Sequence, residues 1–379
     1  MPVTGLPRGL TVSEYGLIPD EPAVLLKSSE YAVHPDEKGD EAILDTISAI
    51  REAGKARDER VLDCNVSFNF QEIHKLFLSP NRDLEQNLLW SAGSFYVMCP
   101  KGEEIVGYFD GASALGGAEV LDELRGKLDN AVKSALELID SQPMVPGEYE
   151  CVCTPAVTGM IVHEAFGHGV EMDMFVKDRA LAKKCVGEYV ASPLIPMHDG
   201  AAVQRDAGSY FFDDEGVLAH DTVIIEKGIL KRGISDAQSA MHLGTEPTGN
   251  GRRESYERKA YTRMTNTYFE PGADTFEDMI ASVKDGFLLD NPSSGMEDPK
   301  NWGIQCMVNV AREIKDGKLT GRIFSPIVLT GYVPDLLKSI TMVSKDFDLE
   351  GGGFCGKGWK EWVKVSDGGP CIKARIRLG

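Results

Sequence analysis

The chain has 379 residues, of which 42% are hydrophobic and 26% are charged; this length favours two or three packed units, and the composition excludes a disordered or fibrous protein. Its 40 Lys and Arg residues against 59 Asp and Glu residues give a net charge of −19, which repels phosphate backbones and anionic lipid surfaces and argues against direct nucleic-acid binding. No apolar run approaches the roughly 18 residues of a membrane span, and the first residues, Met1–Gly5, show no signal pattern, so we expect a cytoplasmic protein without membrane contact.

The first predicted elements are a helix and a hairpin. Within residues 40–57, isoleucines recur at helical spacing, which predicts an amphipathic surface helix. Two β-rich runs follow at residues 88–99 and 104–109, and the turn-forming sequence Pro100-Lys101-Gly102 lies between them. These runs predict a β-hairpin.

A long helix and a break in the helical pattern come next. Across residues 121–139, apolar side chains recur at intervals of three and four, which predicts a helix that ends near Asp140 and covers one face of a sheet. Residues 141–147 cannot continue this helix, because their two prolines lack the amide donor. We therefore expect a boundary between an N-terminal domain, residues 1–145, and a second domain, residues 146–379.

The second domain is expected to be rich in strands. Helical patterns are sparse there, and residues 158–168 and 275–285 are the better candidates. The predicted fold class is α+β: an α/β N-terminal domain followed by a mostly antiparallel β C-terminal domain, which carries the candidate metal-site helix at residues 158–168. The predicted strands are residues 149–153, 222–225, 229–234, 307–314 and 319–323.

The metal-site helix takes its name from the hexad His163-Glu164-Ala165-Phe166-Gly167-His168. Zinc-hydrolase helices space two histidine ligands at i and i+4, with a glutamate between them as general base. Here the spacing is i and i+5, and a regular α-helix sets such side chains roughly 140° apart. Gly167 allows the last turn to widen into a π-type turn or to end, since glycine adds little strain. Two structural histidines near a helix end are the alternative interpretation.

A third ligand must come from elsewhere, because catalytic zinc sites normally use three protein ligands. A glycine-rich segment near the C-terminus offers Cys355, and Lys357 beside it favours the thiolate. The other seven cysteines are scattered along the chain, which favours reduced thiols over a disulfide framework. We predict a Zn²⁺ ion bound by His163, His168 and Cys355, with Glu164 as the catalytic base.

Four motifs together resemble a known family. The hexad His163–His168 is followed by Pro247–Tyr256, Arg263–Tyr268 and Cys355-Gly356-Lys357. In this order they are similar to the TldD/PmbA family, strongly over residues 148–379 and weakly upstream. The hexad is absent from the sister subunit type, so the chain resembles the TldD-type, metal-binding subunit. The resemblance implies a zinc-dependent peptidase in which the two histidines and the C-terminal cysteine bind the metal and the glutamate is the base.

The sequence departs from the family pattern in two places. Family members usually have a longer N-terminal region, so we expect this chain to lack their opening elements. After Lys357 the family continues with a glutamine and a Val-Pro-Val-like sequence, whereas this chain reads Gly358-Trp359-Lys360-Glu361-Trp362-Val363-Lys364; this difference bears on substrate preference more than on metal binding. The resemblance also implies paired subunits, as a homodimer or as a heterodimer with a PmbA/TldE-like sister subunit.

Residues that bind the substrate are harder to identify. Arg252 and Arg253 either hold a substrate carboxylate through forked hydrogen bonds or form a plain surface pair. Glu171 and Asp173, just after the hexad, either orient a ligating imidazole or are solvated. The strand-rich C-terminal part suggests that an unfolded peptide binds mainly through its main chain, as an added strand.

Four functions compete at this stage. The leading hypothesis is a zinc peptidase that acts on unfolded peptides. The second keeps the same site but uses Cys355 as a nucleophile with His168 as its base, and metal analysis separates it from the first. The third is a non-catalytic peptide-binding or regulatory subunit. The fourth, a regulator of DNA topology, is disfavoured by the net charge of −19 and by the lack of a basic recognition helix.

Overall fold

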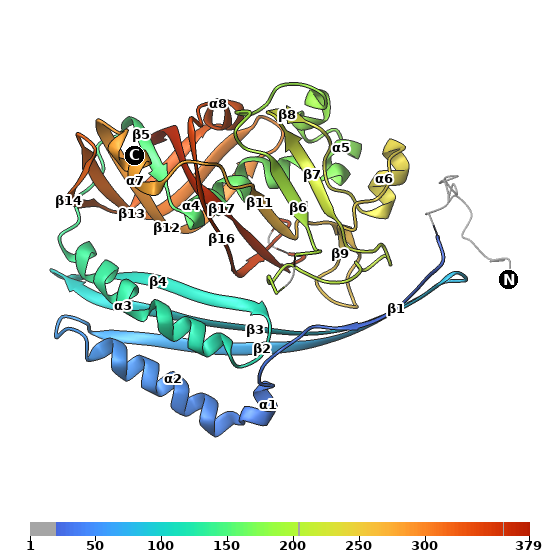
Figure 1. Cartoon of the computed structure of the whole chain (residues 1–379), viewed down its shortest axis with the longest axis horizontal. Helices are drawn as coiled ribbons and strands as arrows, with labels where there is room; N and C mark the ends of the chain where they lie inside the picture. Colours follow the sequence, from blue (N-terminus) through green and yellow to red (C-terminus); the bar gives the residue numbers. More distant parts are fainter. Residues whose placement is uncertain (1–19, 204, 359) are drawn as a thin grey trace.

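The N-terminal part of the chain folds as a twisted sheet with two helices on one face (Figure 1). The computed structural model describes residues 20–203, 205–358 and 360–379; residues 1–19 of the predicted first domain lie outside this range, as does Trp359 of the divergent segment. The long strand β3 lies in the centre of the sheet and pairs parallel with β1 and antiparallel with β2 and β4. The bounds are β1 (Ala23–Ser28), β2 (Asp63–Leu78), β3 (Arg82–Lys101) and β4 (Glu104–Leu115).

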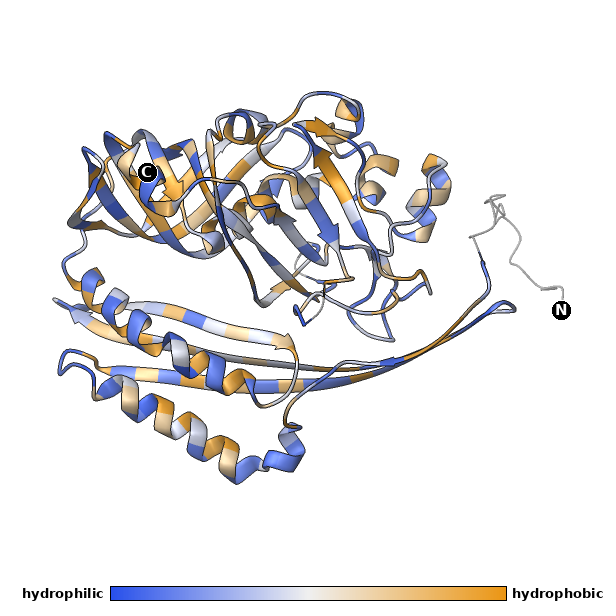
Figure 2. Ribbon diagram, in the orientation of Figure 1, coloured by the Kyte–Doolittle hydropathy of each residue, from blue (hydrophilic) through white to orange (hydrophobic). Residues whose placement is uncertain are grey.

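Two amphipathic helices cover this sheet. They are α2 (Asp40–Lys55), which follows the short helix α1 (Pro35–Lys38), and α3 (Val120–Ile139). Figure 2 shows polar and apolar residues alternating around both helices, and their apolar faces share one hydrophobic cluster with strands β3 and β4. The predicted surface helix, the hairpin and the helix that ends near Asp140 are confirmed.

Strand β2 is not predicted from the sequence, for a physical reason. Its apolar side chains change parity along the strand, from Val66, Phe68 and Phe70 to Ile73 and Phe77. The far half of the β2–β3 hairpin extends beyond the helices (Figure 1), and its side chains are exposed or half-buried on both faces. A strand without a single buried face loses the two-residue alternation that marks it in a sequence.

An 11-stranded sheet makes up most of the C-terminal part in the described residues. The strand pairs β5–β12 and β11–β17 are parallel, and the other described pairs of this sheet are antiparallel. The strands of its main path follow in the order β14 (Lys318–Phe324), β13 (Gly303–Lys315), β12 (Asp285–Asp298), β5 (Gly147–Cys153), β17 (Val363–Leu378), β11 (Asn266–Phe269), β6 (Met197–Gly200), β7 (Asp221–Glu226) and β8 (Ile229–Leu230). Two further strands join this path: β15 (Ile327–Tyr332) pairs with β13 and β17, and β16 (Met342–Cys355) pairs with β17. Strands β9 (Gly251–Arg252) and β10 (Tyr261–Thr262) form a separate pair.

Short helices lie in the connections between the strands of this sheet (Figure 1). The one that positions the candidate site is α4 (Pro155–Val162), which contacts β17 and β12 and continues as a π-helix (His163–Gly167) and a 3₁₀ turn (His168–Val170). The others are α5 (Met172–Val176), a 3₁₀ turn (Leu181–Cys185), α6 (Ala237–Leu243), α7 (Phe276–Ala281) and α8 (Val333–Lys338).

The structure confirms the predicted fold class, a mixed α and β protein with a mostly antiparallel C-terminal sheet. Two elements are shorter than predicted: helix α7 ends at Ala281 because Asp285 already begins β12, and the strand predicted for 229–234 ends at Leu230. The division into domains at residues 145 and 146 stays a prediction, since side chains of β13 and β14 share the hydrophobic cluster of α3.

Candidate metal centre

The two histidines of the hexad lie on a helix that changes its hydrogen-bonding pattern between them. Helix α4 becomes a π-helix over His163–Gly167, and the His168 amide donates to the His163 carbonyl. This i to i+5 bond adds the extra residue per turn that the histidine spacing requires, so the predicted widened turn is confirmed. The two imidazole rings lie 5.1 Å apart, centroid to centroid.

Two glycines let this helix lie close to the strands behind it. A Cβ atom at Gly159 would lie 2.5 Å from Oδ1 of Asp367 on β17, and a Cβ atom at Gly167 would overlap Sδ of Met264. A side chain at either position would push the helix away from the sheet. Gly167 therefore serves close packing as well as the wide turn.

Cys355 completes a cluster with the two histidines. It is the last residue of β16, and its Sγ lies 3.3 Å from Nε2 of His163 and 3.4 Å from Nε2 of His168. One possible ligand atom from each of the three residues lies within 4.8 Å of the others. His163 and Cys355 are buried, and His168 is half-buried. The structure thus brings together the three residues that the sequence predicts as ligands.

Each imidazole faces a carboxylate on the side away from the sulfur. Nδ1 of His163 is buried without a hydrogen bond and lies 3.7 Å from Oδ2 of Asp367, and Nδ1 of His168 lies 3.5 Å from Oε2 of Glu171. A carboxylate in this position favours the tautomer that leaves Nε2 free to bind a metal. Glu171 was one of two sequence candidates for this role; Asp367, on a distant strand, carries no sequence signal.

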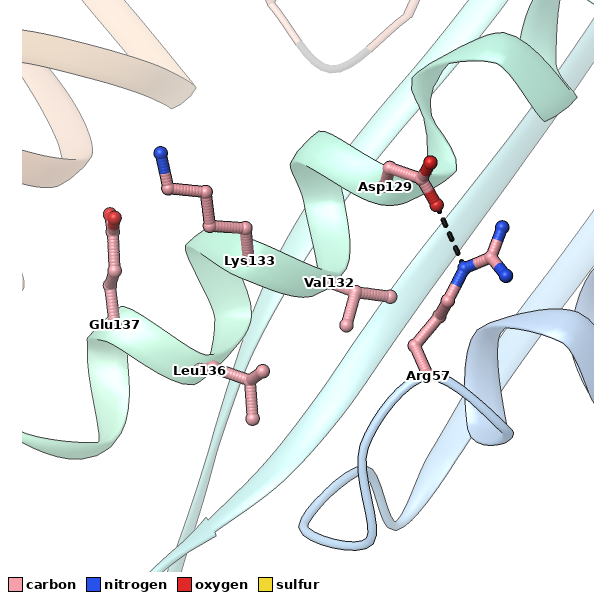
Figure 3. A pocket seen from close by; sticks show the side chains of 6 residues that line it. All are labelled: Arg57, Asp129, Val132, Lys133, Leu136 and Glu137. Atoms are coloured by element: carbon pink, nitrogen blue, oxygen red, sulfur yellow. Dashed lines mark hydrogen bonds and ion pairs between the residues drawn. The ribbon is translucent and has the colours of Figure 1, made fainter.

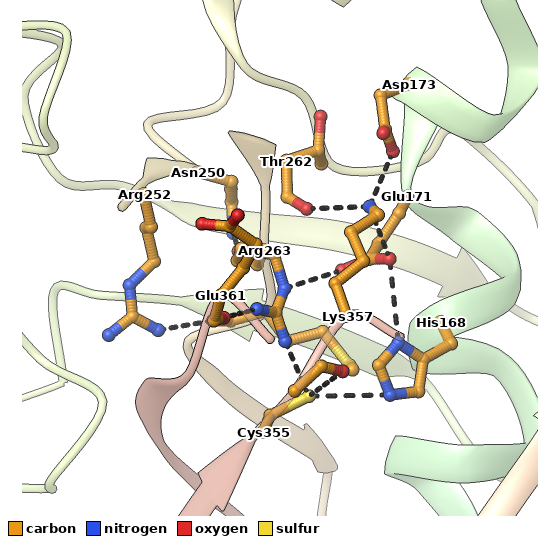
Figure 4. Close-up of polar contacts among 12 residues, drawn as sticks. His168, Glu171, Asp173, Asn250, Arg252, Thr262, Arg263, Cys355, Lys357 and Glu361 are labelled. Atoms are coloured by element: carbon orange, nitrogen blue, oxygen red, sulfur yellow. Dashed lines mark hydrogen bonds and ion pairs between the residues drawn. The ribbon is translucent and has the colours of Figure 1, made fainter. Parts of the chain in front are cut away.

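A buried cation contacts the sulfur of the cluster (Figure 4). Arg263 is 0% exposed, and its Nη2 donates to Sγ of Cys355 at 2.8 Å while its Nε donates to Oε1 of Glu171 at 3.3 Å. Its Nη1 donates to the Glu361 carbonyl. In the sequence, Arg263 stands out only as part of a family motif. The signal for a buried role is that this arginine lies in a strand-like run and is flanked by uncharged residues.

Lys357 binds two carboxylates of the same hydrogen-bond network. Its Nζ donates to Oε2 of Glu171 at 2.9 Å and to Oδ1 of Asp173 at 2.8 Å. Figure 4 shows it reaching these carboxylates on the far side of Glu171 from the sulfur. The sequence suggested Lys357 as the cation near Cys355, but the cation that contacts the sulfur is Arg263.

The electrostatics of the cluster favour a thiolate. Burial by itself raises the pKa of the Cys355 thiol, but the charges of His168 and His163 outweigh burial and hold that pKa well below its ordinary value. The imidazoles respond in the opposite sense: burial lowers their pKa, while the Cys355 charge raises it more, to about 9 for His163. The thiolate is the form of cysteine that binds zinc.

Glu164, the predicted base, is half-buried and lies against β12. A Cβ atom at Gly295 of this strand would overlap Cγ of Glu164, so the glycine makes room for the carboxylate side chain. Two residues further along β12, both carboxyl oxygens of Glu297 are buried without a hydrogen-bond partner, and burial raises the pKa of this carboxyl well above its ordinary value. No sequence motif indicated this second carboxyl group.

A cavity of about 910 Å³ includes both predicted substrate residues in its lining; the lining also includes Phe354, next to Cys355 in the chain, but not the three predicted metal ligands. Arg252 is 9% exposed, and its Nη1 and Nη2 donate to the backbone carbonyls of Met264 and Lys364. Arg253 is half-buried and pairs with Asp214. A role for either arginine in holding a carboxylate stays a prediction.

A separate hollow of about 420 Å³ lies on helix α3 and the loop after α2 (Figure 3). Two of its charged groups pair with each other, since Nε of Arg57 donates to Oδ1 of Asp129 at 2.8 Å, and Glu137 pairs with Arg312. Its lining holds no histidine or cysteine, and we assign it no role. The lining residues are Arg57, Asp129, Val132, Lys133, Leu136 and Glu137.

The donor set of the cluster fits zinc. Imidazole nitrogen and thiolate sulfur are ligands that zinc prefers, and three protein ligands leave a coordination position for a substrate or water. The carboxylates beside both Nδ1 atoms add the outer hydrogen-bonding layer that such sites usually have.

Comparisons with known proteins identify the family of this chain. The model of the PmbA/TldA metallopeptidase C-terminal domain matches residues 146–375. A metalloprotease of Methanocaldococcus jannaschii is 34% identical over 266 residues, which cover 69% of this chain and 58% of that protein. A zinc metalloprotease TldD homolog of Saccharolobus solfataricus is 32% identical over 263 residues, which cover 69% of this chain and 56% of that protein. The matched region thus spans just over half the length of these relatives.

Solved structures share the fold at lower identity. TldE from Thermococcus kodakarensis superposes with a TM-score of 0.74 at 20% identity, over 97% of this chain and 80% of that one. A Thermotoga maritima protein described as a candidate modulator of a DNA gyrase superposes with a TM-score of 0.76 at 19% identity, over 97% of this chain and 78% of that one. Within the described residues, no helix combines the length and the apolar character that a bilayer span requires.

Proposed function

Because this chain belongs to the PmbA/TldD metallopeptidase family, we propose that it is a zinc-dependent peptidase that hydrolyses peptide bonds in unfolded or disordered peptides. The observation that carries the proposal is the convergence of His163, His168 and Cys355 within 4.8 Å, from a helix and a strand far apart in the sequence. A pair of structural histidines would not need a buried thiol within 3.4 Å of both Nε2 atoms.

The roles of the residues follow from their positions. A zinc ion held by the three ligands would supply a Lewis acid for the scissile carbonyl and lower the pKa of water to about 7. Glu164 takes the proton from the attacking water and returns it to the leaving amine. Asp367 and Glu171 hold the imidazoles with Nε2 toward the site.

The substrate class follows from the shape and strands of the site. The cavity of about 910 Å³ runs along residues Gln71–Phe77 of β2, which lies at the edge of its sheet; an extended peptide can pair with such an edge through its main chain. Such pairing is indifferent to most side chains. A folded protein would first have to open a segment locally, which costs free energy, whereas a disordered chain offers the segment at once.

We further propose that the chain works as part of a pair, either with a second copy or with a TldE-like sister subunit. The similarity of its fold to TldE supports this arrangement, and a strand-rich C-terminal part leaves edges to cover. All eight cysteines are free, which suits the reducing cytoplasm.

The test compares one small protein in its native form and in an irreversibly unfolded form, incubated with the zinc-loaded chain and analysed by mass spectrometry. We expect peptides from the unfolded form, none when a chelator is present and none with the Glu164→Gln variant. Equal cleavage of both forms would contradict the substrate class. Zinc binding without any cleavage, alone or with a sister subunit, would favour a non-catalytic peptide-binding or regulatory subunit.

A further inference from the structure

Two cations line the same cavity of about 910 Å³ without a carboxylate partner. Arg252 donates from Nη2 to the backbone carbonyl of Lys364 at 2.7 Å. The Lys364 ammonium lies 4.8 Å from the ring centroid of Trp90 and donates to Oε1 of Gln71. Among the ion pairs of the described residues, none includes Arg252 or Lys364.

The acidic residues that line the same cavity are engaged elsewhere, so they do not neutralise these cations. Each already has a cationic or backbone-amide partner of its own. The partners are His34 for Glu72, backbone amides for Asp213, Lys75 and Arg253 for Asp214, and the Glu361 amide for Glu254.

Lys364 and Arg252 thus face each other's charge without a carboxylate between them. Burial and the nearby charge of Arg252 lower the pKa of Lys364 to about 8, as expected for two like charges close together in a partly buried place. An anion bound between them would remove this repulsion. The Lys364 ammonium has donors to spare, because it has three and one is used by Gln71.

We propose that Lys364 and Arg252 form a carboxylate-binding subsite of the cleft, a proposal that rests on the proposed peptidase function. Lys364 pairs with Phe354 in the β16–β17 register, and its ammonium lies 5.6 Å from the centroid of the Phe354 ring. Phe354 precedes Cys355 on β16, with its side chain on the opposite face of the strand. Lys364 donates to the carboxylate, and Arg252 contributes its charge, since both its Nη atoms already hold carbonyls. The carboxylate comes either from the C-terminus of the peptide or from an Asp or Glu side chain.

The subsite coincides with the segment in which the sequence departs from its family. Trp362 and Lys364 lie in that segment and line the cavity together with Trp90. The subsite would therefore give this chain a substrate preference of its own, on top of main-chain pairing.

The experiment measures peptide binding to the Glu164→Gln protein, which leaves the peptides intact, by the change in fluorescence of the cavity tryptophans. Three matched peptides are compared: one with a free C-terminal carboxylate and an internal Gln, one with a C-terminal amide and an internal Gln, and one with a C-terminal amide and an internal Glu. We expect one of the two acidic peptides to bind about tenfold more tightly than the neutral peptide, and which one identifies the source of the carboxylate.

Variants of the lysine then locate the effect. Lys364→Met should remove the preference and Lys364→Arg should keep most of it, while Lys360→Met, a control in the same segment but outside the cavity lining, should leave it unchanged. Equal affinity for the three peptides, or a preference that survives Lys364→Met, would overturn the subsite. If a Lys364 variant fails to fold, the comparison of the three peptides on the Glu164→Gln protein, which keeps Lys364, still tests whether the carboxylate is preferred. If acidic peptides bind more tightly but the wild-type chain cleaves no peptide, the subsite is supported and the peptidase function is refuted. If the wild-type chain cleaves peptides without a preference for acidic ones, the peptidase function is supported and the subsite is refuted.

Discussion

The guanidinium of Arg263 lies 2.8 Å from the sulfur of Cys355, and both groups are buried. The same guanidinium pairs with Glu171, which faces the Nδ1 atom of His168. One side chain therefore fixes the position of the thiolate directly and the orientation of an imidazole through its carboxylate partner. This relationship links the two halves of the metal cluster before any metal is bound.

Replacing Arg263 by methionine should lower the free energy of unfolding by about 3–5 kcal/mol, because it removes one partner of a buried ion pair and leaves Glu171 less compensated. Urea denaturation of the metal-free protein measures this loss. The matched control is Arg375→Met, whose side chain is 66% exposed and pairs with the exposed Glu148; its loss should stay within about 1 kcal/mol. Similar small losses in both variants would contradict the buried role of Arg263.

The variant Glu164→Gln should abolish hydrolysis of an unfolded protein while it keeps its zinc. The amide cannot accept the proton from water, and the side chain is not among the three ligands. Rates and zinc content are measured on the same preparation. A variant that still cleaves at the wild-type rate, or that loses zinc as completely as a histidine variant, would show that Glu164 is not the base.

Gly295→Ala should lower the turnover number without loss of zinc or of stability. Its new Cβ atom would overlap Cγ of Glu164 and push the carboxylate from its place, whereas the ligands lie elsewhere. Gly331→Ala on β15 is the control, since its Cβ atom would meet only Ile304, at 3.9 Å. The two variants are compared by turnover number, zinc content and melting temperature, and equal turnover in both would count against the positioning of Glu164 by β12.

Elements with a regular local pattern were easier to predict from the sequence than the contacts between elements. Helices α2 and α3 carry regular apolar stripes, and the β3–β4 turn has a clear Pro-Lys-Gly sequence, so local patterns suffice for them. Strand β2 lacks such a pattern because much of it lies beyond the helices that cover the sheet. The i+5 spacing of the histidines even indicated the π-helix, since no regular helix could bring them together.

The supporting residues of the site could not be predicted in the same way. Asp367, Arg263 and Glu297 reach the cluster from three different strands or loops, and only the folded sheet brings them beside the hexad. A single sequence shows residue types but not which distant carboxylate faces which imidazole. The same limit explains why the sequence indicates Lys357, two residues after Cys355, as the cation near the thiolate, whereas the structure places Arg263 in contact with the sulfur.

A pH-dependent prediction concerns His198, outside the metal cluster. Its Nδ1 and Nε2 atoms lie 2.7 Å from Asp221 and 2.9 Å from Glu270; burial lowers its pKa, but the two carboxylates outweigh burial and raise it. A raised pKa in the folded state means that the stabilisation is complete below the unfolded value of about 6.5 and is lost as the pH rises through the folded value. The stability advantage of the wild type over His198→Gln should therefore be larger at pH 6 than at pH 9. Urea denaturation at the two pH values checks this, and an equal or growing advantage at pH 9 would contradict it.

The central claim, that His163, His168 and Cys355 form one zinc site, is tested most directly by the zinc content per chain of protein purified without chelator. We predict about one zinc ion per wild-type chain and per Cys185→Ser chain, whose cysteine lies outside the cluster, and a loss of most of the zinc in Cys355→Ser. Zinc retained at one ion per chain in Cys355→Ser, or no zinc in the wild type, would contradict the assignment.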